Sequence, residues 1–376
     1  MSWLLTEDHL DDLARGAAVL GTGGGGDPYV GRLLVRQAIR EFGPVTVLDP
    51  SEVDDGALVV PTAQMGAPTV VHEKIPSGAE PVTALRALED HLGARADATM
   101  PIECGGINSM IPLVVAARTG LPVVDADGMG RAFPELQMET FGVYGITGSP
   151  MAVAGERGES AVIDTGADNR RMEWLARGVT IRLGGVAHIA EYSMSGADVK
   201  RTAIPRTLSL AHTVGSAIRE AREHHTDPVA QLADRLGDTL YGHLRVLFRG
   251  KISDVERRTE AGFARGRASA VSFDGEHRLD VEFQNEHLVA LVDGEVRCVV
   301  PDLVCVLDSE LAEPITTESL RYGQRVTAIG ISTPAIMRTP EALAVFGPAA
   351  FGLPYDFRPV ESTPQVLHPD GDRTPR

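Results

Sequence analysis

The chain has 376 residues, of which 43% are hydrophobic and 23% are charged, a composition typical of a soluble globular protein of about two or three domains. The formal net charge of −17 argues against nucleic acid or an anionic membrane as a partner, because both attract basic surfaces. Three widely spaced cysteines without a CxxC pair argue against a disulfide framework. We therefore expect a cytoplasmic protein with reduced thiols, no signal peptide and no membrane-spanning segment.

The N-terminal region predicts a helix over residues 6–18, a glycine loop at residues 23–26 and a second helix capped by Asp27. Consecutive glycines can adopt positive φ and let a ligand approach the backbone closely. The loop lacks the GxxxxGK[ST] pattern and follows a helix, so a pocket wall is favoured over a phosphate or dinucleotide site. Gly24 and Gly25 are the expected substrate contacts in this loop.

A loop framed by glycines and prolines, residues 62–78, follows the first two predicted strands and contains His72, Glu73 and Lys74. Rigid sheets present functional side chains on such loops. Glu73 and Lys74 are therefore candidate catalytic residues, and His72 is a candidate metal ligand. The alternative is a solvated surface turn.

The densest group of chemically useful side chains lies in residues 101–138. An apolar helix is predicted over 110–118, ended by Gly120, and a buried strand over 121–124. Asp125 and Asp127 follow this strand, and ligands bind beyond the carboxyl ends of strands in open α/β sheets. Strand alternation would send both carboxylates to one face. The candidate site residues of this stretch are Glu103, Cys104, Asn108, Asp125, Asp127, Arg131 and Glu135.

Each candidate also has a structural interpretation. The two aspartates are common turn residues, and Cys104 is a residue type that is often simply buried. Arg131 and Glu135 are four residues apart and fit a helical ion pair. Lys200 is a possible substrate contact in a segment that also fits an ordinary linker.

The remaining chain changes character near residue 244. Helices are predicted at 81–92, 169–177 and 207–223, and strands at 45–48, 57–61, 151–153, 160–163 and 179–183. From residue 246 onward, short β-like runs separated by Asp-Gly turns predict antiparallel hairpins in a small barrel or sandwich. We therefore predict an α/β N-terminal domain over residues 1–165, a β-rich C-terminal domain over 166–358 with an inserted helix at 207–223, and a disordered tail over 359–376.

Several motifs occur together and in order, which is more specific than any one of them. They are GTGGGGDPY at 21–29, Glu73-Lys74, ECGGIN at 103–108, DADGMGRAFPELQM at 125–138, QNE at 284–286, PDL at 301–303 and VFGPAAFG at 345–352. Over roughly residues 5–355 the chain resembles the S-methyl thiohydantoin desulfurase domain family, whose members occur alone, or fused to or beside hydantoinase/oxoprolinase proteins. The resemblance implies an N-terminal α/β domain, a C-terminal β-domain, and a metal-dependent hydrolysis that releases a thiol from a five-membered thiohydantoin ring.

Such a reaction needs an activated water, a group that takes up charge from the ring, and a proton for the leaving thiol. A divalent metal such as zinc can lower the pKa of bound water and accepts the side-chain types of Glu103, Cys104, Asp125 and His72. Asp125, Asp127, Arg131 and Glu135, with Glu73 and Lys74, are then the catalytic candidates, and Asn108 and Lys200 join the glycine loop as substrate contacts.

The expected substrate is a small cyclic amide or thioamide. The alternatives are a non-catalytic subunit or ligand-binding partner of a hydantoinase-like enzyme, and, more weakly, a nucleotide-binding enzyme that uses the glycine loop. A homo-oligomer or a hydantoinase-like partner is compatible with the sequence, which shows no interface signature.

Overall fold

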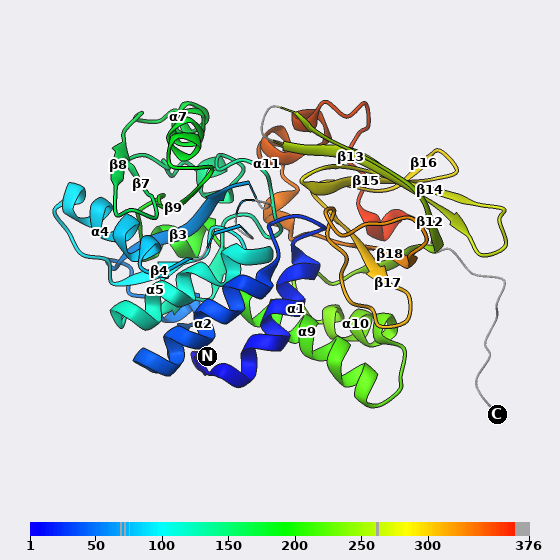
Figure 1. The fold of residues 1–376 in the computed structure, drawn as a ribbon, viewed down its shortest axis with the longest axis horizontal. Helices are drawn as coiled ribbons and strands as arrows, with labels where there is room; N and C mark the ends of the chain where they lie inside the picture. The colour runs from blue at the N-terminus through cyan, green and yellow to red at the C-terminus, as the bar shows by residue number, and fades with distance from the viewer. Residues whose placement is uncertain (68–69, 71–72, 75, 261–262, 365–376) are drawn as a thin grey trace.

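Two halves of the chain lie side by side in the computed structural model, which describes residues 1–67, 70, 73–74, 76–260 and 263–364 (Figure 1). The N-terminal half is built on a mixed sheet in the order β1-β2-β5-β4-β3-β9-β7-β8, with β10 paired to β3. The pairings β2–β5, β5–β4 and β4–β3 are parallel. The strands are β1 (Trp3–Leu5), β2 (Val45–Leu48), β3 (Leu58–Gly66), β4 (Ala98–Met100), β5 (Val123–Val124), β7 (Met151–Ala154), β8 (Ser160–Ile163), β9 (Val186–Ala190) and β10 (Met194–Ser195).

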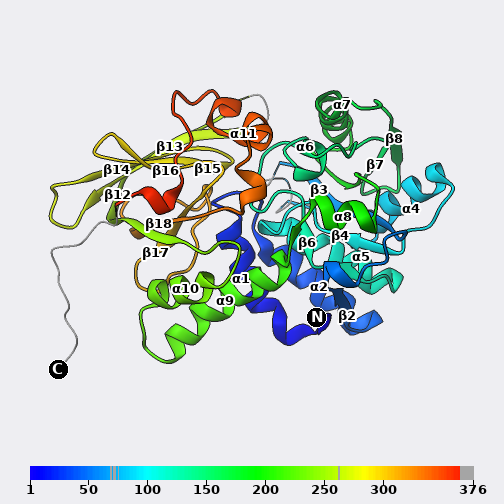
Figure 2. The same cartoon turned by 180° about the vertical axis from the view of Figure 1, so that it is seen from behind.

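Helices pack against this sheet and against one another. They are α1 (Leu10–Leu20), α2 (Pro28–Phe42), α4 (Glu80–Leu92), α5 (Ile111–Thr119), α6 (Thr140–Val143), α7 (Asn169–Arg182) and α8 (Gly196–Thr202). From behind, α9 (Thr207–Glu223) and α10 (Pro228–Gly237) run below the second half and beside α1 (Figure 2). Gly16 and Gly215 allow this close approach, because a Cβ on either would lie within 2 Å of the other helix's backbone.

The C-terminal half is an antiparallel sheet in the order β16-β15-β14-β13-β12-β18-β17. Its strands are β12 (Leu244–Glu260), β13 (Phe263–Ser272), β14 (Arg278–Gln284), β15 (Glu286–Val292), β16 (Glu295–Val299), β17 (Leu303–Asp308) and β18 (Arg325–Ile331), and α11 (Pro340–Phe346) follows. The edge strands β16 and β17 do not pair with each other within the described part of the chain, so the sheet is a half-barrel. The predicted combination of an α/β half and a β-rich half is confirmed.

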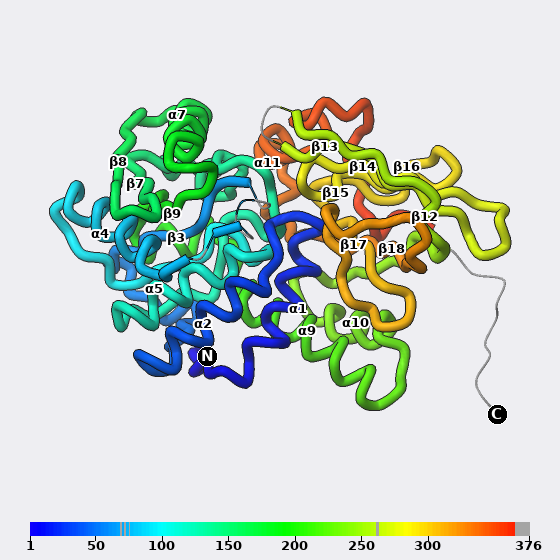
Figure 3. The backbone as a smooth tube through the Cα atoms, in the orientation of Figure 1, coloured from blue at the N-terminus to red at the C-terminus, as the bar shows by residue number. Residues whose placement is uncertain are grey.

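Local signals explain most helix boundaries. The side chain of Asp27 accepts the Tyr29 N–H at the start of α2, as predicted. Gly120 adopts the left-handed conformation that ends α5, because a glycine has no Cβ to clash there. The two halves meet at the loop after α1, where the Thr22 carbonyl accepts the His287 N–H and the Gly23 carbonyl accepts the Thr317 N–H (Figure 3).

Two predictions about elements need correction, and two strands of the N-terminal sheet lie beyond residue 165. The strand predicted at 179–183 is wrong, because α7 continues through these residues to Arg182 and buries Thr180 on the same face as Met172 and Ala176. β9 and β10 lie beyond residue 165, yet they belong to the N-terminal sheet. The tail is ordered at its start, because Val360 is fully buried and its N–H is donated to Asp302 Oδ2. Residues 365–376 lie outside the described residues.

Candidate active site

A cavity of about 90 Å³ lies where the two halves meet, and it receives residues from both. This volume is far below the roughly 300–1,000 Å³ of pockets for drug-sized ligands, so the cavity suits a small molecule. Its apolar wall comes from the N-terminal half: Met65, Ile102, Ile107, Met129, Phe133 and Leu136. Its polar lining is Asp27, Gln64, Glu103, Asn108, Glu135, Arg177, Asn285, Glu286 and Glu318, together with glycines 24–26.

Glu286 is the first residue of β15 and the most exceptional polar group of the cavity. Its side chain is 2% exposed; Oε1 accepts the Gly25 N–H at 3.2 Å, and Oε2 has no hydrogen-bond partner among the described residues. Burial raises the pKa of Glu286 to about 8, although the charge of Arg131 opposes the shift. Near neutral pH this carboxyl group is therefore mainly protonated, with one oxygen free to act on a ligand.

The glycine loop makes room for β15. A Cβ on Gly24 would lie 2.3 Å from Glu286 Oε1, and one on Gly23 would lie 2.4 Å from the His287 ring. Gly25 has a φ of +73°, a conformation that other residues rarely adopt. The loop thus forms a wall of the cavity, which Gly24 and Gly25 both line.

Glu103 and Asn108 belong to the N-terminal half and form a hydrogen-bonded pair in the lining of the cavity. Asn108 Nδ2 donates to Glu103 Oε1 at 2.8 Å, and Asn108 also bonds both backbone groups of Gln64. Glu103 Oε2 accepts the Phe133 N–H at 3.3 Å. Burial raises the pKa of Glu103 well above its ordinary value, and the charge of Glu286 adds to this effect. The pair is therefore held rigidly in the cavity wall.

Glu135 also lines the cavity and is half-buried. The Gln137 side-chain amide donates a hydrogen bond to Glu135 Oε2, which orients the carboxyl group. The chain is not helical here, so the alternative of a helical ion pair between Arg131 and Glu135 is not observed. Of the predicted site residues, the cavity brings together Gly24, Gly25, Glu103, Asn108 and Glu135.

Asp125 and Asp127 lie outside the lining of the cavity. Asp125 Oδ1 accepts the N–H groups of Leu208 and Ser209, and the Ser209 hydroxyl donates to its Oδ2, so this carboxylate caps α9. Asp127 accepts the Cys104 N–H at 2.6 Å and the Gly130 N–H at 2.9 Å, and burial raises its pKa to about 7. Both aspartates hold backbone turns in place.

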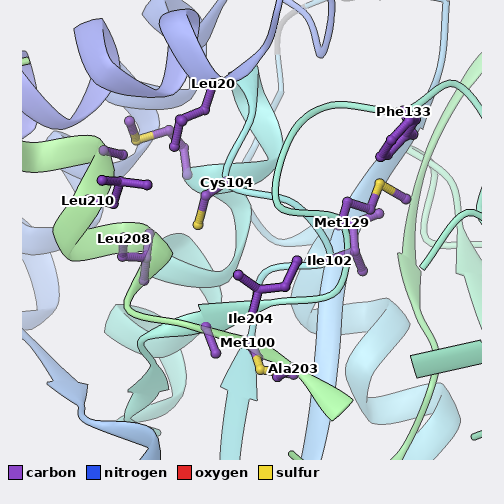
Figure 4. Close-up of a cluster of buried hydrophobic side chains, with 14 of the residues drawn as sticks. Leu20, Met100, Ile102, Cys104, Met129, Phe133, Ala203, Ile204, Leu208 and Leu210 are labelled. Atoms are coloured by element: carbon purple, nitrogen blue, oxygen red, sulfur yellow. The ribbon is translucent and has the colours of Figure 1, made fainter. Parts of the chain in front are cut away.

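Cys104 is buried in an apolar cluster, and Arg131 is buried among hydrogen-bond acceptors from both halves of the chain. The Cys104 side chain points into an apolar cluster with Leu20, Ile102 and Leu208, and burial raises the pKa of its thiol (Figure 4). The Arg131 guanidinium donates to Thr22 Oγ1 at 2.6 Å, to the backbone carbonyls of His287 at 2.9 Å and Asp302 at 3.2 Å. Arg131 therefore ties the two halves together.

The candidates on outer loops are not brought to the cavity. Glu73 is exposed, and Lys74 Nζ lies 3.1 Å from Glu156 Oε2 beside a smaller cavity that also contains His188. Lys200 is exposed and pairs with Asp55 at 2.6 Å. His72 lies outside the described residues.

The predicted metal ligands do not converge in the described part of the chain. Glu103 faces the cavity, Cys104 faces the apolar cluster, and both oxygens of Asp125 accept hydrogen bonds from the start of α9. No group of three or more His, Cys, Asp or Glu residues suited to a metal ion occurs among the described residues. We therefore assign no step to a metal.

Sequence reasoning did not identify Glu286 as a site residue, although it is the last residue of the QNE motif. A second omission is a pair of buried carboxyl groups, Glu139 and Glu191, whose side-chain oxygens have no hydrogen-bond partner in the described chain. Burial raises the pKa of both well above the ordinary value, and Glu191 adds to the effect on Glu139. Their only sequence signal is a charged residue within an otherwise apolar run.

None of the described helices is long and apolar enough to cross a membrane. No curated protein matches the chain. A crystal structure of a protein from Chromobacterium violaceum has the same fold, with 24% sequence identity, a TM-score of 0.80, and coverage of 95% of this chain and 100% of that one. The family descriptions "S-Me-THD-like, N-terminal domain" and "S-Me-THD-like, C-terminal domain" match residues 8–165 and 167–360. The chain therefore belongs to the S-Me-THD-like family.

Proposed function

We propose that the chain is a hydrolase of a small five-membered cyclic amide or thioamide, of the S-methyl thiohydantoin class, and that the reaction takes place in the cavity between the two halves. The family name supports the class of substrate. The observation that carries the proposal is the free, buried oxygen of Glu286 in a small cavity with an apolar wall. The apolar part of the lining, which includes Ile102, Met129 and Phe133, can accommodate an S-methyl group.

The reaction replaces a ring C–S bond with a C–O bond. A water oxygen attacks the ring carbon that carries sulfur, the adjacent ring nitrogen takes up a proton, and the C–S bond then breaks. The carbon keeps the oxygen as a carbonyl, and methanethiol leaves with the remaining proton. One water is consumed, and a hydantoin and a thiol are formed.

Two carboxyl groups are assigned to the proton transfers. Glu286 donates its proton to the ring nitrogen, because burial keeps it protonated near neutral pH. Glu135 takes one proton from the attacking water and returns it to the leaving thiolate. The hydroxyl proton left on the ring carbon returns to Glu286 as the carbonyl forms and the C–S bond breaks, which restores the acid. Glu103 and Asn108 position the ring through the rigid hydrogen-bonded pair in the cavity wall. This division gives the acid and the base to different halves of the chain.

The assay follows release of methanethiol from a 2-methylthio-imidazol-4-one with a thiol reagent, and formation of the hydantoin by chromatography. The three cysteines are buried, so the protein itself should contribute little thiol signal. Glu286→Gln and Glu135→Gln should each lower kcat about 10²-fold or more. Glu276→Gln is the matched control, because Glu276 is exposed in the turn between β13 and β14.

Metal dependence stays a prediction, and parallel reactions with a chelator and with added zinc test it. Absence of turnover by folded protein under all of these conditions would contradict the proposal. If the ring then still bound without reacting, the alternative of a ligand-binding partner for a hydantoinase-like enzyme would be favoured.

A further inference from the structure

We propose that the cavity selects a ring carrying a cationic N–C–N group, such as a cyclic amidinium, a cyclic guanidinium or a protonated isothiourea, and that Glu286 is the carboxylate that recognises it. This inference rests on the proposed function, because it identifies the charge state of the ring that the same cavity prefers. It is separable from that function, because binding can be measured with compounds that contain no sulfur.

The first observation is an unused acceptor in a buried position. Glu286 is 2% exposed, its Oε1 is held by the Gly25 N–H, and its Oε2 has no partner within the described chain. The carboxyl group occupies the space that the missing side chain of Gly24 leaves. An unsatisfied buried oxygen is costly, so a ligand N–H donor at this position would stabilise the site.

The second observation is the balance of charge around the cavity. Arg177 is the one basic side chain among its described lining residues, and this guanidinium is already paired with Glu173 and donates to the Pro134 carbonyl. Acidic side chains outnumber it on the same lining: Asp27, Glu135 and Glu318, in addition to Glu103 and Glu286, whose carboxyl groups burial keeps mainly protonated near neutral pH. Such a cavity disfavours an anionic ring and favours a cation.

A planar N–C–N cation fits both observations. It presents N–H donors in its plane to carboxylate oxygens, and its faces can lie against the apolar wall. When Glu286 transfers its proton to an S-methyl thiohydantoin, the ring becomes such a cation beside the new carboxylate. The cavity would therefore stabilise the charge that develops during the reaction more than the neutral ring, which is the requirement for catalysis.

The charged groups around Glu286 define its pH behaviour. Burial raises its pKa to about 8, Arg131 lowers it, and Glu318 raises it. Glu103 lies near enough for the two carboxyl groups to interact, and Asp27, Glu135 and Arg177 share the cavity. A bound cation favours the ionised form, and a shift of the Glu286 pKa by roughly 1–3 units means that binding at pH 7 should release roughly 0.4 to 0.9 of a proton.

The test compares two rings of the same shape by calorimetry on the intact chain. The probes are 2-aminoimidazoline, a cyclic guanidinium, and imidazolidin-2-one, its neutral counterpart. The cation should bind at least about tenfold more tightly at pH 8, because an adjacent opposite charge shifts a carboxyl pKa by roughly 1–3 units and the coupling is reciprocal. Titrations in buffers of different ionisation enthalpy measure the proton release at pH 7.

Glu286→Gln should remove both the preference and the proton release, and Glu276→Gln should retain both. Equal affinity for the two rings in the wild-type chain, or binding of the cation without proton release, would overturn the inference, and neither result depends on whether a variant folds. Either result combined with turnover of the methylthio ring would leave the proposed hydrolase standing. Selective binding of the cation without any turnover would instead support the inference and contradict the hydrolase.

Discussion

The protonation state of Glu286 sets the pH dependence of the reaction. A general acid works only when it carries its proton, and burial holds the pKa of Glu286 at about 8. We therefore predict that kcat is retained below this pH and falls as the pH rises through about 8. The measurement is a pH–rate profile of thiol release at saturating substrate.

A Glu286→Gln variant should lack this alkaline limb as well as most of the activity, and Glu276→Gln should keep the wild-type profile. A wild-type rate that rises steadily from pH 7 to pH 9 would show that Glu286 acts as a base, and the assigned roles of the two carboxyl groups would then have to be exchanged.

Asp125 caps the start of α9. Its removal should therefore lower stability, whereas the removal of a catalytic residue would lower turnover. Asp125→Ala leaves the buried N–H groups of Leu208 and Ser209 without an acceptor, so we predict a loss of about 1–3 kcal/mol in the free energy of unfolding. Asp227→Ala at the exposed start of α10 should cost less, because water can replace the cap. Denaturant unfolding measures both.

Turnover per folded molecule should change little in either variant, because neither carboxylate lines the cavity. If Asp125→Asn abolished turnover while the unfolding midpoint stayed at its wild-type value, Asp125 would belong to the catalytic machinery as the sequence analysis expected.

At the scale of elements, the loop between α1 and α2 contributes to the site because its glycines leave space for the side chain of Glu286. A methyl group on Gly24 would meet Glu286 Oε1 at 2.3 Å and would displace the carboxyl group. We predict that Gly24→Ala lowers kcat about 10²-fold, since misplacing a catalytic group by about 1 Å has an effect of this size. Activity and far-UV circular dichroism measured together separate displacement from unfolding.

Gly178→Ala is the matched control for this substitution. Gly178 lies exposed within α7 with no atom near its missing Cβ, so alanine should raise helix stability by about 0.5–1 kcal/mol and leave kcat unchanged. Equal activity of the two alanine variants would exclude a role for the glycine loop in placing Glu286.

Elements with a local stop or start signal could be predicted from the sequence, and those decided by tertiary contacts could not. Gly120 and Asp27 mark helix ends by their own conformational preferences. The apolar run at 179–183 fits a strand or a helix equally well, and packing of α7 decided it. The same division holds in the site. Local motifs point to residues 103–108 and Glu135 as site candidates. The place of Glu286 in the cavity depends on its contact with Gly25, which is 261 residues away in the sequence.

At the scale of the whole molecule, the cavity exists only because the two halves are held together. Arg131 donates to groups of both halves from a fully buried position, and a carboxyl group from each half faces the cavity. A linear sequence reveals such a junction only as separate motifs. This explains why the residues of the DADGMGRAFPELQM motif divide between roles: Glu135 lines the cavity, while Asp125 and Arg131 fix the architecture around it.

The fold also buries several carboxyl groups, and these should govern stability as a function of pH. Burial is the main cause that raises the pKa of Glu103, Glu139 and Glu191 well above the ordinary value, that of Asp127 to about 7 and that of Glu286 to about 8. A folded-state pKa above the unfolded value stabilises the fold at low pH, and the stabilisation is lost as pH rises through the folded-state pKa.

We therefore predict that Tm is highest near pH 5–6 and is lower by at least about 5 °C at pH 9. Below about pH 4 it should fall again, because groups such as Glu89 behave oppositely: burial opposes the shift, but the Ala96 N–H and the guanidinium groups of Arg86 and Arg95 lower its pKa. Scanning calorimetry across pH measures the curve. Glu139→Gln and Glu191→Gln, which cannot ionise, should reduce the decline between pH 6 and pH 9, whereas the exposed Glu276→Gln should leave it unchanged. A Tm that rises over this interval in the wild-type chain would mean that these carboxyl groups are ionised and paired in the folded state, and the acid assigned to Glu286 would lose its physical basis.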